Sequence, residues 1–123
     1  MRKEQINKKG YVYILLSKDK EIYKIGSTDN IKIRMKALKR FWGDFDIDDC
    51  IAIECDREFK FRLESMLLTL MSEHKVSFDD EEKENGWSEF FYATSLTQLK
   101  SFIDNMLHKF IKDIKVINLK EIM

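Results

Sequence analysis

The chain has 123 residues and a mass of 14.8 kDa, with 44% hydrophobic and 12% aromatic residues, which suits one folded domain and argues against a disordered chain. Its 22 basic and 22 acidic residues cancel, but residues 1–40 hold 12 basic against 4 acidic ones, and residues 41–123 hold 10 against 18. Phosphate binding requires local rather than overall positive charge, so a nucleic-acid partner is not excluded. The alternative is that folding mixes the two halves and removes the asymmetry.

The longest apolar run, Tyr11 to Leu16, is far below the roughly 20 residues that span a bilayer, and the charged N-terminus has no apolar signal core. We therefore expect no membrane segment and an intracellular location, in the cytoplasm or, for a viral chain, in the host cytoplasm or nucleus. Cys50 and Cys55 fit such a compartment as free thiols on opposite faces of a strand. Two cysteines without suitably spaced histidines do not predict a zinc site.

The first third of the chain predicts a hairpin followed by a helix. Aromatic and β-branched residues favour a strand at 11–17, and a second strand at 22–26 follows a charged turn. Residues 27–30 are helix-capping types, and a helix is predicted over 31–41. The apolar face of this helix consists of Ile31, Met35 and Leu38.

The rest of the chain continues the alternation of strand and helix. An acidic loop at 43–49 leads to a third strand at 50–55 and a helix at 59–72. The predicted core positions of that helix are Phe59, Leu63, Met66, Leu67 and Leu70. A solvated loop at 79–86 then precedes a short strand at 89–93.

An amphipathic helix is predicted from Leu96 to about Lys112. Its apolar residues are Leu99, Phe102, Ile103, Met106, Leu107 and Phe110. The last ten residues suit either a short strand or a partner-binding tail. This helix and tail also offer a contact surface for a homodimer or for a partner protein.

The predicted order is β-β-α-β-α, then a short strand and a C-terminal helix. Such an order favours an α+β fold in which a small antiparallel three-stranded sheet is flanked by helices. We expect one domain over residues 10–95, with a C-terminal helix and tail, residues 96–123, packed on the same domain.

The hairpin carries two motifs whose spacing resembles that of the GIY-YIG nuclease superfamily: Tyr11-Val12-Tyr13, ten residues, then Lys24-Ile25-Gly26. The continuation over 26–34, with its threonine, asparagine and arginine, agrees with the family, as does Glu64 in the helix after the third strand. Four pieces in the right order are more specific than any one of them. The Tyr-Lys-Ile-Gly form and the segment 86–91 resemble a branch of small phage and poxvirus proteins.

The resemblance implies a metal-dependent endonuclease that hydrolyses DNA phosphodiester bonds with one Mg²⁺ or Mn²⁺ ion. Tyr13 would orient or deprotonate the attacking water, Arg34 would clamp the transition-state phosphate, and Glu64 would bind the metal. Each has an ordinary alternative as well: Tyr13 packs in the sheet, and Glu64 is a surface residue paired with Lys60 or Arg57.

Two positions depart from the family pattern. Lys24 stands at the second tyrosine, where it could bind phosphate or act as a base, or be an exposed strand lysine. Tyr23 should face the other way and is kept in reserve, whereas Tyr11 should share the face of Tyr13 and lie beside it in the catalytic set. Leu38 stands where many members have a histidine. The alternative function is therefore a catalytically weak domain that binds nucleic acid or a protein.

Further residues are expected to contact nucleic acid. Gly26 would let phosphate approach the backbone, while Thr28 and Asn30 would cap a helix whose exposed N–H groups suit an anion. The cations of that helix are Lys32, Lys36, Lys39 and Arg40, followed by two aromatic residues, Phe41 and Trp42. Their alternative is a solvated helix face. No catalytic role is assigned to His74 and His108, and Glu89 is a weaker metal-ligand candidate.

Overall fold

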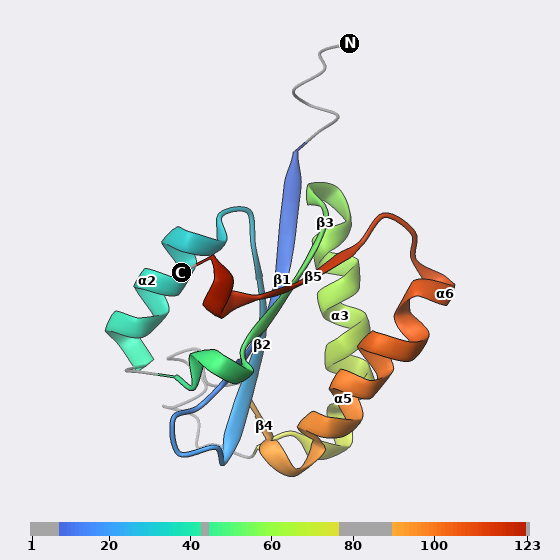
Figure 1. The fold of residues 1–123 in the computed structure, drawn as a ribbon. Helices are drawn as coiled ribbons and strands as arrows, with labels where there is room; N and C mark the ends of the chain where they lie inside the picture. The colour runs from blue at the N-terminus through green and yellow to red at the C-terminus, as the bar shows by residue number, and fades with distance from the viewer. Residues whose placement is uncertain (1–7, 43–44, 77–89, 123) are drawn as a thin grey trace.

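A five-stranded antiparallel sheet organises the chain in the computed structural model, which describes residues 8–42, 45–76 and 90–122 (Figure 1). The order of the strands across the sheet is β4-β2-β1-β3-β5. The strands are β1 (Lys9–Leu16), β2 (Ile22–Thr28), β3 (Ile51–Asp56), β4 (Phe90–Tyr92) and β5 (Lys115–Asn118).

Helices cover both faces of this sheet. Figure 1 shows α2 on one side and α3 together with the C-terminal helices on the other. The helices are α2 (Ile31–Trp42), α3 (Lys60–Leu70), α5 (Leu96–Phe102), a π-helix (Ile103–Leu107) and α6 (His108–Phe110). Short 3₁₀ turns occupy Ile47–Asp49, Arg57–Phe59, Ser72–His74, Ala93–Ser95 and Leu119–Glu121.

The predicted α+β class is confirmed, and the structure adds detail to the sheet. The three predicted central strands gain β4 on one edge and β5 on the other, so the tail forms a strand against β3. Strand β2 continues two residues past Gly26, to Thr28, because it keeps pairing with β1 as far as Tyr11. The predicted loop at 79–86, the motif at 86–89 and Glu89 lie outside the described residues.

The expected core positions of two helices need correction. In α3 the buried positions recur every four residues at Leu63, Leu67 and Met71, so Leu70 faces outward and is exposed. The C-terminal helix is interrupted by a π turn, which contains more residues per turn than an α-helix. Its buried positions also recur every four residues, at Leu99, Ile103 and Leu107. Met106 and Phe110 are consequently exposed rather than in the core.

The core lies on both sides of β1, because alternate residues of a strand point to opposite faces. Val12 and Ile14 point to the face that carries α3, while Tyr13 points to the other, and all three are buried. Cys50 and Cys55 are buried free thiols, as expected. Within the described residues, no helix is both long enough and apolar enough to cross a bilayer.

Candidate active site at the edge of strand β2

The register of β1 and β2 determines which candidate residues share a face of the sheet. Tyr13 pairs with Gly26, and Leu15 pairs with Lys24. Directly paired residues lie on the same face of an antiparallel sheet, so Tyr13, Lys24 and Gly26 are neighbours on the face that α2 covers. Tyr11 shares this face, as expected.

Gly26 makes room for the phenol of Tyr13. A Cβ atom on Gly26 would overlap the hydroxyl and ring of Tyr13, which therefore lie directly over the glycine. Tyr13 is 1% exposed, so its ring is part of the core while its hydroxyl reaches over β2. The missing side chain at Gly26 is thus explained on this face by the tyrosine, where the sequence suggested an approach for phosphate.

Lys24 is buried rather than an exposed strand lysine. Only 7% of its surface is accessible, and its Nζ lies 5.2 Å from the centroid of the Phe90 ring, which is the paired residue on β4. An ammonium over an aromatic face is attracted to the ring electrons, which partly offsets the loss of water. The lysine is therefore held beside Tyr13 on the same face of the sheet.

Tyr23 and Tyr11, the other two tyrosines of the predicted catalytic set, form hydrogen bonds outside the site. Tyr23 faces away from Tyr13, as predicted, and its hydroxyl is 2.7 Å from Ser95 Oγ, with its ring stacked on Phe91 at 5.5 Å. The Tyr11 hydroxyl donates to Glu54 at 3.3 Å. Burial raises the pKa of Tyr23, and burial together with the nearby carboxylate raises the pKa of Tyr11. Both phenols therefore stay protonated near neutral pH.

The predicted capping residues form hydrogen bonds within the connection from β2 to α2. The Asn30 side chain accepts a hydrogen bond from the Ile33 amide at 3.1 Å, and Thr28 Oγ1 lies 3.2 Å from both the amide and the carbonyl oxygen of Asn30. An N-cap of this kind satisfies an amide that has no partner within the helix. Arg34 follows one turn later and is exposed. Leu38, one turn beyond, packs against the core, so it offers no polar group.

Glu64 is brought to β2 by α3. Ser27 Oγ donates to Glu64 Oε1 at 2.8 Å, across 37 positions of sequence. Lys60 and Arg57, the ordinary partners considered for this glutamate, contact Asp29 instead. The carboxylate is half-buried and lies one residue from Gly26.

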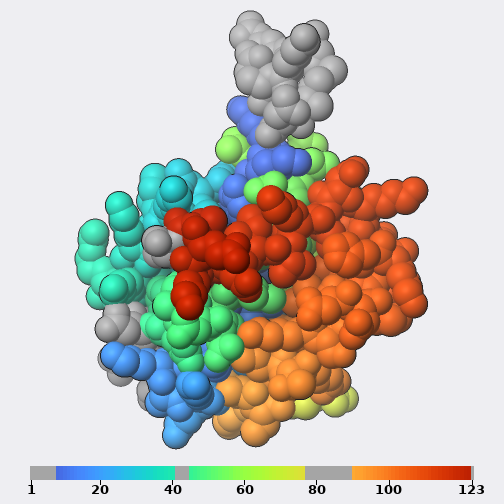
Figure 2. All heavy atoms as spheres, viewed as in Figure 1, coloured from blue at the N-terminus to red at the C-terminus, as the bar shows by residue number. Residues whose placement is uncertain are grey.

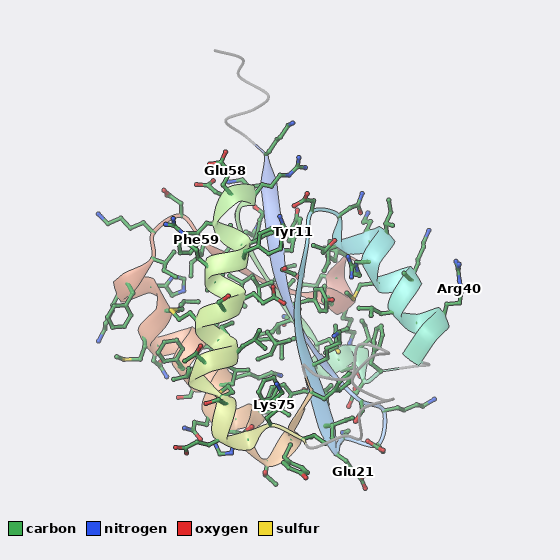
Figure 3. The ribbon with its side chains drawn as sticks, turned by 180° about the vertical axis from the view of Figure 1, so that it is seen from behind. Tyr11, Glu21, Arg40, Glu58, Phe59 and Lys75 are labelled. Carbon is green, nitrogen blue, oxygen red and sulfur yellow. The ribbon has the colours of Figure 1, made fainter. Side chains whose placement is uncertain are left out.

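Tyr13 and Glu64 therefore approach adjacent residues of β2 from opposite faces of the sheet. Strand β4 pairs with β2 only as far as Lys24, and no described strand covers the outer edge of β2 beyond it. Figure 3 looks toward this edge, with α3 on one side of β2 and α2 on the other. A phosphodiester lying along the edge would meet groups from both faces.

The exposed cations of α2 form a basic surface on the same side. Lys32, Lys36, Lys39 and Arg40 are all exposed, and α2 contains no acidic residue. Arg40 projects away from the sheet (Figure 3). Figure 2 shows α2 and the C-terminal helices at opposite sides of the molecule. The side chains of Phe41 and Trp42 lie outside the described residues.

A single carboxylate is the donor that this site offers to a metal ion. Among the described residues, no group of three or more His, Cys, Asp or Glu side chains could hold an ion. Mg²⁺ is commonly bound through one or two carboxylates, with waters and substrate phosphate completing the shell. Glu64, half-buried beside the part of β2 whose outer edge no described strand covers, fits that pattern.

Sequence reasoning assigned no role in the site to Ser27 and Asp29, and it considered Lys60 only as an ordinary partner of Glu64. Ser27 and Asp29 were seen only as capping types. The alternation of side chains along a strand could have indicated their role, because it places both residues on the face opposite Gly26, toward α3. Lys60 stands four residues before Glu64 and so shares its helix face, which indicated that this face bears charge as well as apolar residues.

A family model, that of the T5orf172 domain, matches residues 10–107. No curated protein and no solved structure was found to match the chain. The matched range includes the whole candidate site, from Tyr13 to Glu64, and continues through α5 and the π-helix.

Proposed function

Because the chain belongs to the T5orf172 domain family, whose fold is GIY-YIG-like and associated with nucleases, we propose that it is a metal-dependent endonuclease that hydrolyses DNA phosphodiester bonds. The observation that carries the proposal is the 2.8 Å hydrogen bond from Ser27 to Glu64. It holds a carboxylate one residue from the glycine on which Tyr13 lies, at an edge of β2 that no described strand covers.

In the proposed mechanism, Tyr13 and Lys24 act on the face that α2 covers. The Tyr13 side chain orients the attacking water and, as the phenolate, accepts its proton, so the phenol must first release its own proton to solvent. Lys24 contributes a positive charge on the same face, which favours the deprotonated phenol and attracts the phosphate. Tyr13 is the first tyrosine of the family pattern, and Lys24 replaces the second.

Arg34 and Glu64 act on the charge that develops at phosphorus. The guanidinium of Arg34 can hold two phosphoryl oxygens at once, which stabilises the transition state more than the ground state. Glu64 would hold one Mg²⁺ or Mn²⁺ ion, and such an ion stabilises negative charge on the leaving oxygen. Gly26, Thr28, Asn30 and the cations of α2 would bind the DNA backbone around this point.

The test is a nicking assay on supercoiled plasmid and on branched DNA, with Mg²⁺, Mn²⁺ or EDTA. Glu64→Gln keeps an oxygen that can accept from Ser27 but removes the charge, and Arg34→Ala removes the clamp. Each should lower the rate at least about a hundredfold, as is common when charge stabilisation is lost. Glu58→Gln and Arg62→Ala are matched controls on exposed residues, and both should cut like the unaltered protein. Equal cleavage by Glu64→Gln would remove Glu64 from the mechanism.

The second candidate function is a catalytically weak domain that binds nucleic acid. It is favoured by the burial of Tyr13 and Lys24, which limits access of water to both groups, and by Leu38 at the position of the family histidine. Salt-sensitive DNA binding, without cleavage in the presence of any metal ion tested, would favour this second function.

We also propose that the chain is related to a branch of small phage and poxvirus proteins. This relation rests on the Tyr-Lys-Ile-Gly form of its second motif.

A further inference from the structure

A buried lysine stands where α3 begins. Lys60 is 7% exposed, and its Nζ lies 2.7 Å from Asp29 Oδ1 in the connection between β2 and α2. Taking an ammonium out of water is costly unless it is paired and hydrogen-bonded. The backbone carbonyl of Arg57 accepts a second hydrogen bond at 3.4 Å, and the ring of Phe61 lies 4.1 Å from the ammonium.

The same carboxylate meets a second cation, and the backbone leaves space for both. Arg57 Nε lies 3.5 Å from Asp29 Oδ2, an ion pair too long and poorly aligned to count as a hydrogen bond. A Cβ on Gly10 would lie 2.9 Å from Lys60 Cδ and 3.0 Å from the Arg57 Cα. The absence of a side chain at Gly10 thus lets the start of α3 pack directly on β1.

Helix α3 therefore contacts the end of β2 and the residue that follows it through two polar interactions. Lys60 and Glu64 are one helical turn apart, and their partners, Asp29 and Ser27, are two residues apart and so point to the same side of the extended chain. Thr28, between them, points to the opposite side, and its hydroxyl bonds to the backbone of Asn30.

Asp29 directly precedes Asn30, the residue that caps the N-terminus of α2. Asn30 accepts from the amide of Ile33 through its side chain and from the amide of Arg34 through its carbonyl, both at 3.1 Å. A displacement of Asp29 is therefore transmitted to the first turn of α2 through the neighbouring residue and its two hydrogen bonds.

We infer that Lys60 is a positioning residue: through Asp29 it fixes the first turn of α2, and with it Arg34, against Glu64. The catalytic consequence rests on the proposed endonuclease function, whereas the fixing of α2 by α3 does not. Since the effect of a misplaced group on a reaction rate is steep, loosening this pair should slow catalysis without removing a group that touches the substrate.

The structural part is tested by amide hydrogen exchange at pH 7. In Lys60→Met, which keeps the apolar stem, the amides of Ile33 and Arg34 should exchange about tenfold faster, while Ile14 in the central strand changes much less. Lys60→Arg should restore most of the protection. Lys120→Met is the matched control, because it breaks an ion pair with Asp48 at 3.2 Å that is exposed on both sides and does not include Asp29.

The catalytic part is tested by plasmid nicking with the same variants, and with Asp29→Asn as a second way to break the pair. We expect kcat to fall about tenfold in Lys60→Met and Asp29→Asn, KM for DNA to stay within about twofold, and Lys60→Arg to recover most of kcat. A purely structural role would lower the fraction of active protein and leave kcat per active molecule unchanged.

Each outcome decides one claim. Unchanged exchange at Ile33 and Arg34 in Lys60→Met overturns the inference, whether or not the protein cuts DNA. Faster exchange with an unchanged kcat overturns the catalytic role of Lys60. Absence of cleavage by the unaltered protein defeats the proposed function, and the exchange experiment then still decides whether Lys60 fixes α2.

Discussion

Tyr13 and Gly26 are the residue pair on which the candidate site is built. Their backbones are directly paired, and the tyrosine ring fills the volume that a side chain at Gly26 would need. Gly26→Ala should therefore destabilise the protein by about 1–3 kcal/mol, since forcing an extra methyl group into a packed region displaces its neighbours. Urea denaturation measures this loss as a lower midpoint at an unchanged slope.

The contact with Tyr13 can be separated from the general cost of a bulkier residue in the strand. In a Tyr13→Leu background, the ring that meets the new methyl group is absent, so Gly26→Ala should cost much less. An equal cost in both backgrounds would show that Tyr13 is not the reason for the glycine. Such a double-mutant cycle is suited to residues in direct contact.

Tyr23 shows how one strand separates two similar side chains. It lies next to Lys24 in sequence but on the opposite face, with its hydroxyl 2.7 Å from Ser95 Oγ and its ring against Phe91. Tyr23→Phe should lower the free energy of unfolding by about 1 kcal/mol, because one buried hydrogen bond is lost. The loss is no larger because Ser95 Oγ keeps its hydrogen bond to the carbonyl of Tyr92. Its nicking rate should equal that of the unaltered protein, and a hundredfold loss would return Tyr23 to the catalytic set.

Secondary-structure elements were predictable where the apolar residues kept one spacing, that of a strand or that of a helix, over the whole element. The hairpin, α2 with its Asn30 cap, and β3 follow from alternation, capping types and helical spacing. The π turn was not predictable, since buried residues four apart at Leu99, Ile103 and Leu107 fit an α-helix almost as well. The exposure of Leu70 depends on which neighbour lies opposite, and local spacing carries no such information.

The site residues were harder to predict than the elements that carry them. The family spacing indicated Tyr13, Arg34 and Glu64, but it could not indicate that Glu64 meets Ser27, because that contact depends on how α3 packs on the sheet. An exposed position on the strand was one of the alternatives that the sequence left open for Lys24. Its burial follows from β4, which arrives from a distant part of the sequence and places Phe90 beside it.

Helix α2 makes a prediction that concerns binding rather than cleavage. Its cations line one exposed surface without a nearby acidic residue in the helix. Replacing Lys32, Lys36 and Arg40 by alanine should weaken DNA binding and lower the slope of log K against log salt concentration, by up to about 0.9 for each phosphate that is no longer neutralised. Fluorescence anisotropy over a salt series measures this slope. The matched control replaces three exposed lysines elsewhere, Lys109, Lys112 and Lys120, and should leave the slope unchanged.

At the scale of the whole molecule, the basic residues are concentrated in one part of the chain, whereas the core residues come from all parts of it. The basic first third supplies β1, β2 and α2, whereas the core draws on all five strands and on α2, α3, α5 and the π-helix. Residues that are far apart in sequence, such as Cys50 and Leu16, meet there through a hydrogen bond from an amide to sulfur at 3.3 Å. Unfolding should therefore be cooperative and expose both thiols together.

The two thiols make stability depend on pH at the alkaline end. Burial raises the pKa of Cys50 and of Cys55 from 9.0 to about 11, so the unfolded chain loses these protons at a lower pH than the folded protein. The contribution of each thiol is complete below pH 9 and is lost as the pH rises toward 11, because the unfolded state then binds fewer protons.

Urea midpoints measured from pH 7 to 10.5 should fall above pH 9, and the fall should be shallower in a Cys50→Ala, Cys55→Ala double variant. That variant has a constant deficit from the lost side chains, so the test is the difference in slope and not in the midpoint itself. Tyr23, whose pKa is also raised by burial, adds a further decline only above about pH 10, which Tyr23→Phe removes separately. Parallel pH profiles for the double variant and the unaltered protein would mean that the thiols are not buried in solution as they are in this fold.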